Sequence, residues 1–201
     1  MMHYLTQIFL DAKALWEHNI RDDYSIHRFV YSCFPLENDE PTGRFLYVDK
    51  GATRGGRILL VLSEKEPSLP EGISSSTSIL SEHFLSFARY AFEVELNPVK
   101  RDKNSGKRQA VIGQLNLLKW FLDHTEKWGF TVDTDSLSVH SQATRRFQKG
   151  DEKYTFNRAL FRGKLTVINR ELFSQTFFQG IGHGKGFGFG LLQLCPIQNF
   201  K

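Results

Sequence analysis

The chain has 201 residues, 40% of them hydrophobic and 18 of them phenylalanine, which suffices for the core of one large or two small domains. Its formal net charge of +4 is mild, and no apolar run reaches the roughly 18 residues of a membrane-spanning helix. The N-terminus lacks the pattern of a signal peptide, and Cys33 and Cys195 lie in apolar segments typical of a reduced core. We therefore expect a cytoplasmic protein with no membrane partner.

The first half of the chain predicts the element order β-α-β-β-α-β. Apolar residues at helical spacing favour a helix over residues 24–34, with Asp22 or Asp23 as N-cap and Pro35 as its stop. A short helix is expected at 80–88. Strands are expected at residues 4–10, 44–48, 57–63 and 92–96.

The second half repeats this order less clearly. A basic loop at 101–113 precedes an amphipathic helix at 114–128, and a second helix is expected between Asn169 as N-cap and Gly180. Strands are expected at 131–132, 137–146, 154–168 and 188–194. The element order predicts an α+β chain of two tandem ferredoxin-like (RRM-like) βαββαβ domains, at residues 1–97 and 98–201.

The first predicted helix carries a polar aromatic face beside its apolar stripe. Tyr24, His27, Arg28 and Tyr31 follow the i, i+3, i+4, i+7 spacing of one helix face. An imidazole that moves a proton, a phenol that donates and a cation that stabilises negative charge are the groups that phosphodiester cleavage needs. The alternative is that this is an exposed face of the helix with no role in catalysis.

Glycine occupies every second position from Gly180 to Gly190. Such a backbone suits N–H groups that grip a phosphate backbone, so Gly182, Gly184 and Lys185 are candidate nucleic-acid contacts. The spacing does not complete G-x-G-x-x-G, and no Ser or Thr follows the Gly-Lys pair, which disfavours an enzyme acting on a small nucleotide. The alternative for this segment is a tight turn packed under a bulky neighbour.

Two basic stretches predict a polyanionic partner. The first-choice candidates for binding RNA phosphates lie between residues 145 and 158, and the second-choice candidates lie between 100 and 108. The seven histidines are scattered, without metal-ligand spacing, so we expect no metal and no cofactor. The candidates are Arg145, Arg146, Lys149, Lys153 and Arg158, then Lys100, Arg101, Lys107 and Arg108.

Several motifs, in this order along the chain, resemble the CasE family of type I-E CRISPR RNA-processing endoribonucleases. The last of them, a G-I-G-x-x-K-x-x-G-x-G-L-L pattern, is highly specific. The sequence departs from the common form at residues 186–188, which are richer in glycine, and at Arg162, where an acid is frequent. The motifs are D-Y-S-I-H-R at 23–28, F-P at 34–35, R-F-L-Y at 44–47, L-N-P-V-K at 96–100, L-F-R-G-K-L at 160–165 and the segment 180–192.

This resemblance implies tandem ferredoxin-like domains and metal-independent cleavage of the repeat hairpin of precursor CRISPR RNA, leaving a 2′,3′-cyclic phosphate. It implies that the protein stays on its product as a subunit of Cascade. The family's catalytic histidine falls on His27, its supporting tyrosine on Tyr24 and its loop lysine on Lys185; Arg28, beside them, is a candidate RNA contact. A catalytically silent RNA-binding scaffold of the same superfamily is the alternative.

Overall fold

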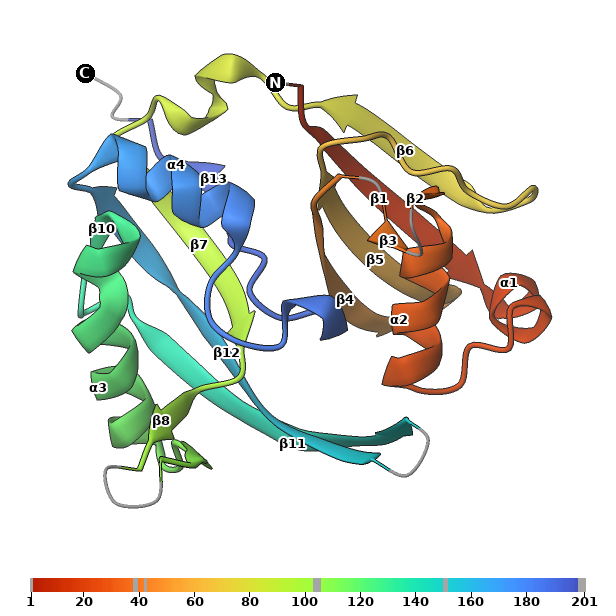
Figure 1. Ribbon diagram of the computed structural model, residues 1–201. Coiled ribbons are helices and arrows are strands. Elements are labelled where there is room, and N and C mark those ends of the chain that lie inside the picture. The colour runs from red at the N-terminus through yellow and green to blue at the C-terminus, as the bar shows by residue number, and fades with distance from the viewer. Residues whose placement is uncertain (1, 38–39, 42, 103–105, 150–151, 199–201) are drawn as a thin grey trace. The chain divides into compact units, whose positions relative to one another are not determined.

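The computed structural model describes residues 2–37, 40–41, 43–102, 106–149 and 152–198 (Figure 1). The chain divides into two compact units. The first unit comprises residues 1–81 and 186–188, and the second comprises residues 82–185 and 189–201. Three residues from the glycine-rich segment thus pack with the N-terminal unit.

The first unit contains a four-stranded antiparallel sheet with the order β4-β5-β1-β6. Along β1, Thr6, Ile8 and Leu10 are buried and alternate with more exposed residues, the period of a strand with one face on a core. When these four strands are numbered 1 to 4 along the chain, their order in the sheet is 2-3-1-4, which is the strand order of a ferredoxin-like domain. The strands are β1 (Tyr4–Asp11), β4 (Phe45–Thr53), β5 (Gly56–Ser63) and β6 (Ser74–Ile79).

Helix α2 (Asp23–Ser32) lies over one face of this sheet (Figure 1). Its Ile26, Phe29 and Val30 belong to the same buried cluster as Ile8 and Leu59 of the strands. Residues 64–73 contain no helix, so an irregular connection replaces the second helix of the ferredoxin-like pattern. The remaining elements of this unit are α1 (Ala12–Glu17) and the strand pair β2 (Leu36–Glu37) and β3 (Glu40–Pro41).

The second unit has the sheet order β10-β12-β7-β13, and β11 also pairs with β12. This is again the ferredoxin-like order, with the second strand split into β10 and β11 along one edge of β12. The elements are β7 (Arg89–Leu96), β8 (Val99–Arg101), β9 (Arg108–Ala110), α3 (Gln114–Thr125), β10 (Phe130–Val132), β11 (Ser138–Lys149), β12 (Glu152–Val167), α4 (Arg170–Gln179) and β13 (Gln193–Pro196).

Aromatic side chains fill the core of the second unit. Phe121 of α3 stacks on Phe161 of β12, with ring centroids 4.4 Å apart, and lies 5.7 Å from Phe92 of β7. Phe173 of α4 packs on Tyr90 of the same strand, with centroids 5.5 Å apart. Because Tyr90 and Phe92 point to one face of β7, both helices cover the same face of the sheet (Figure 1).

The structure divides the chain earlier than the expected boundary after residue 97. The strand expected to close the first half, at 92–96, is part of β7, which pairs with β12 and β13 of the second unit. The polar strand β6 closes the first sheet instead. The helix expected at 80–88 is a single 3₁₀ turn, Glu82–Leu85.

The two cysteines differ in their exposure to solvent. Cys33 is buried in the first unit, but Cys195 of β13 is exposed, so the prediction of a core position was wrong for Cys195. In the described part of the chain, no helix combines the length and the apolar character needed to cross a membrane.

Candidate active site

Helix α2 holds an imidazole between two phenols on one face. The ring centroids of Tyr24 and His27 are 5.8 Å apart and nearly parallel, and those of His27 and Tyr31 are 4.1 Å apart. Ile26 and Val30 on the neighbouring face are buried, which fixes the rotation of the helix. Asp22 fixes its start, because the Asp22 carboxylate accepts a hydrogen bond from the Ser25 backbone N–H in a capping box.

The residues 186–188 contact this face of α2 within the first unit. The Gly186 carbonyl oxygen lies 2.5 Å from His27 Nδ1 and accepts a second hydrogen bond, at 3.2 Å, from the Tyr47 hydroxyl of β4. The Phe187 ring stacks on the imidazole with centroids 4.7 Å apart. Because a carbonyl oxygen only accepts, Nδ1 must carry a proton, so in the neutral ring Nε2 is the nitrogen that can accept one.

Glycine leaves room for the rings where this segment approaches them. A Cβ on Gly186 would lie 2.9 Å from the Tyr31 hydroxyl oxygen, and a Cβ on Gly188 would lie 3.0 Å from Cε2 of Tyr47. Gly188 also has a φ of +82°. Burial raises the pKa of Tyr31, so its phenol keeps its proton and remains a hydrogen-bond donor.

The predicted RNA contacts Gly182 and Gly184 lie in the second unit and differ in how much space surrounds them. Gly182 is exposed, and a Cβ there would meet only Leu96. A Cβ on Gly184 would lie 2.9 Å from Phe189 and 3.4 Å from Phe156. Gly184 therefore serves the packing of the second unit, which is the alternative reading of this segment.

Positive charges converge beside the predicted loop lysine. The pKa of His183 is lowered by its partial burial and by the nearby positive charges of Arg108 and Lys185. Arg108 belongs to the basic segment that was the second choice for RNA contacts. The structure thus brings this segment and the glycine-rich segment together within the second unit.

The basic strand residues predicted to bind RNA lie on two paired strands of the second unit. Arg145, Arg146 and Lys149 are in β11, which pairs with β12 along the stretch that contains Lys153. The backbone there is extended and antiparallel, and the side chains of these four residues lie outside the part of the chain that the structure describes.

Arg158 of β12 takes part in a buried ion pair. Its guanidinium donates two hydrogen bonds to the carboxylate of Glu95 on β7, and the one from Nη2 to Oε2 is 2.6 Å long. Only 4% of Glu95 is exposed. The charge of Arg158 therefore compensates a buried carboxylate inside the second unit, which disfavours a direct role in RNA binding.

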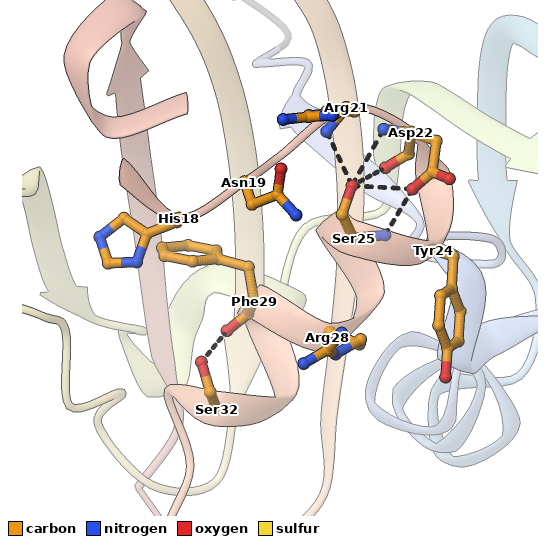
Figure 2. A pocket seen from close by; sticks show the side chains of 9 residues that line it. All are labelled: His18, Asn19, Arg21, Asp22, Tyr24, Ser25, Arg28, Phe29 and Ser32. Carbon is orange, nitrogen blue, oxygen red and sulfur yellow. Dashed lines mark hydrogen bonds between the residues drawn. The ribbon is translucent and has the colours of Figure 1, made fainter. Parts of the chain in front are cut away.

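A cleft of about 390 Å³, which we call the α2 cleft, opens beside the face of α2 that carries His27, within the first unit (Figure 2). Tyr24 and the predicted RNA contact Arg28 line it from α2, and the connection from α1 faces them. The α2 cleft is lined by His18, Asn19, Arg21, Asp22, Tyr24, Ser25, Arg28, Phe29 and Ser32.

Sequence reasoning did not find Tyr47, Phe187 or the Gly186 carbonyl. A backbone carbonyl carries no sequence signal, and Tyr47 reads as an ordinary strand residue within the R-F-L-Y motif. Within the described ranges, no three His, Cys, Asp or Glu residues are grouped so as to hold a metal ion.

The sequence is similar to proteins of CRISPR systems over almost its whole length. A family model described as "CRISPR associated protein" matches residues 3–196. The CRISPR-associated endoribonuclease Cse3 of Thermus thermophilus is 25% identical over 210 residues, covering 96% of this chain and all of the relative. The CRISPR system Cascade subunit CasE of Escherichia coli K12 is 23% identical over 206 residues, with 96% and 100% covered.

Solved structures share the fold. Thermus thermophilus Cse3, bound to an RNA representing a pre-cleavage complex, matches with a TM-score of 0.81 at 23% identity, covering 98% of this chain and all of that one. Cas6e from Escherichia coli K-12 matches with a TM-score of 0.74 at 22% identity, covering 96% and 100%. These matches agree with the tandem ferredoxin-like fold derived above from the strand orders.

Proposed function

Because the chain belongs to the CRISPR associated protein family, we propose that it is an endoribonuclease that cuts the repeat hairpin of precursor CRISPR RNA. We further propose that it stays on its product as a Cascade subunit, as its similarity to CasE favours, and that it works in the cytoplasm with these partners. The observation that carries the catalytic part is the fixed imidazole of His27, whose Nδ1 is held by the Gly186 carbonyl.

The proposed reaction is attack by the ribose 2′-OH on the adjacent phosphate. A bond forms between the 2′-oxygen and phosphorus, and the bond from phosphorus to the 5′-oxygen of the next nucleotide breaks. The 2′-OH gives up a proton, and the leaving 5′-oxygen takes one. The products are a 2′,3′-cyclic phosphate and a 5′-hydroxyl, and Nε2 of His27 is the atom that exchanges one of these protons.

The phenols on either side of His27 provide the remaining polar groups of the reaction. Tyr24 and Tyr31 can donate hydrogen bonds to the phosphate oxygens as negative charge develops on them. Tyr31 carries its proton at neutral pH, as an ordinary tyrosine does, and burial raises its pKa further. The phosphate is thus expected beside the ring of His27, between the two hydroxyls.

The stem of the hairpin is expected to be bound by its shape and its phosphates, because the major groove of A-form RNA is deep and narrow. We assign this contact to the basic residues of β11 and β12, Arg145, Arg146, Lys149 and Lys153, together with Lys185. Arg158 instead stabilises the strand that carries them, through Glu95.

The test uses a labelled repeat hairpin in excess EDTA, in an all-ribose form and in a form with 2′-deoxyribose 5′ to the scissile phosphate. The protein should cut the first and bind the second without cutting it. His27→Ala should cut about 10²- to 10⁴-fold more slowly and bind the hairpin like the unaltered protein. His83→Ala, which removes an exposed imidazole from the 3₁₀ turn, is the matched control.

Binding of the hairpin without any cleavage by the unaltered protein would favour the scaffold alternative. Cleavage of the deoxy substrate would refute the attack by the 2′-OH. Cleavage by His27→Ala at a normal rate would remove His27 from the reaction.

A further inference from the structure

The wall of the α2 cleft that faces α2 is held by packing and backbone hydrogen bonds. This wall is the connection between α1 and α2, where Asn19 adopts a left-handed φ of 52° and Ile20 is buried. The Ile20 N–H donates to the Leu15 carbonyl at 2.8 Å, and the His18 ring packs edge-on against Phe29 of α2 with centroids 5.3 Å apart. A ligand would therefore not have to order this wall in order to bind.

The cleft carries an excess of positive charge. Arg21 and Arg28 are exposed, and within the described residues neither guanidinium makes a hydrogen bond or an ion pair (Figure 2). The acid in the lining, Asp22, accepts hydrogen bonds from the backbone N–H and the hydroxyl of Ser25, so its carboxylate is engaged in the cap of α2. Two planar cations beside an occupied carboxylate favour a phosphate as the ligand.

The cleft adjoins the catalytic group through a shared side chain. Tyr24 lines the cleft, and its ring centroid is 5.8 Å from that of His27. A strand whose scissile phosphate lies at His27 would place a neighbouring nucleotide against Tyr24. A volume of about 390 Å³ lies at the small end of ligand pockets, which matches one nucleotide and not a helical stem.

We propose that the α2 cleft binds a single-stranded nucleotide next to the scissile phosphate, with Arg21 and Arg28 on its phosphate. This inference rests on the proposed function. The rings of His18 and Tyr24 offer surfaces on which an unpaired base stacks, a mode of binding open to single strands and closed to a stacked duplex. The cleft therefore recognises the RNA that flanks the hairpin and not the hairpin itself.

The test compares three substrates with the same hairpin and scissile bond. One has single-stranded flanks on both sides, and each of the others has one flank trimmed to the nucleotide at the cut. Arg21→Gln should raise the KM of the fully flanked substrate by roughly fivefold and leave kcat nearly unchanged. The same change should have no effect on the trimmed substrate that lacks the flank bound in the cleft. Arg54→Gln, in the exposed turn between β4 and β5, is the matched control.

An equal effect of Arg21→Gln on all three substrates, or no effect on any of them, would overturn the proposal. An equal effect of Arg54→Gln on the KM would also overturn the proposal, because it would show that the net charge of the protein, and not a binding site in the cleft, sets the KM. These outcomes are separate from the proposed function, which is decided by whether the unaltered protein cuts the trimmed and flanked hairpins at all.

Discussion

Gly186→Ala tests whether the approach of residues 186–188 to α2 sets the rate of cleavage. The added methyl group would lie 2.9 Å from the Tyr31 hydroxyl oxygen and 4.0 Å from Cε1 of His27. An ordinary contact is on the order of 3.5 Å, so the phenol or the Gly186 carbonyl must move by roughly half an ångström. Since a misplacement of about 1 Å at a reacting group costs about 100-fold, we expect a loss of roughly tenfold in the cleavage rate.

The assay is single-turnover cleavage with saturating protein, so that weaker binding does not contribute to the rate. Gly186 has no positive φ, so alanine adds the steric contact without backbone strain, and the melting temperature should change little. Gly72→Ala is a control for lost stability without a steric contact, because Gly72 has a φ of +83° and open space around its Cα. It should lower stability by about 1 to 2 kcal/mol and leave cleavage unchanged. Cleavage by Gly186→Ala at the normal rate would refute the reasoning.

Three further predictions concern side chains around the two sheets. Tyr47→Phe removes the hydroxyl that donates to the Gly186 carbonyl, so single-turnover cleavage should slow by about 2- to 10-fold. The Gly186 carbonyl still accepts from Nδ1 of His27, so nitrogen NMR of His27 should show a shifted Nδ1–H resonance with the tautomer kept, and an unchanged spectrum would contradict the role. Arg145→Glu combined with Arg146→Glu should weaken hairpin binding, and the slope of log K against log salt should flatten by roughly 0.7 to 0.9 per lost phosphate contact. Glu95→Ala should lower the free energy of unfolding in urea by on the order of 3 kcal/mol, because it leaves a mostly buried guanidinium without its partner, whereas Glu93→Ala at the more exposed pair should cost less than about 1 kcal/mol.

The sequence predicted the elements whose signal is local. The helix at 24–34 and the strand at 57–63 were found because their apolar residues repeat with the period of the buried face, and the Asp22 cap is visible in the residue types. Strand β6 was missed because its sequence, S-S-S-T-S-I, lies at the edge of its sheet and buries almost nothing. Without β6, the strand at 92–96 was assigned to the wrong sheet, and the domain boundary moved with it.

The residues of the candidate site also divide into those with a local sequence signal and those without one. Tyr24, His27 and Tyr31 were found together because helical spacing alone places them on one face. The carbonyl that holds the imidazole comes from Gly186, 159 residues further along the chain, and no periodicity connects two such positions. The pairing of Arg158 with Glu95 was equally hidden, because it depends on the register of β12 against β7.

The first unit is discontinuous, since residues 186–188 complete it after the whole of the second sheet except β13 has been made. During synthesis, the strands β1 to β6 and helix α2 leave the ribosome long before the residue that orients their histidine. A nascent chain of this protein therefore lacks the carbonyl that accepts a hydrogen bond from Nδ1 of His27. Nuclease activity is expected only after Gly188 has emerged from the ribosome. Incomplete chains should therefore not cleave cellular RNA.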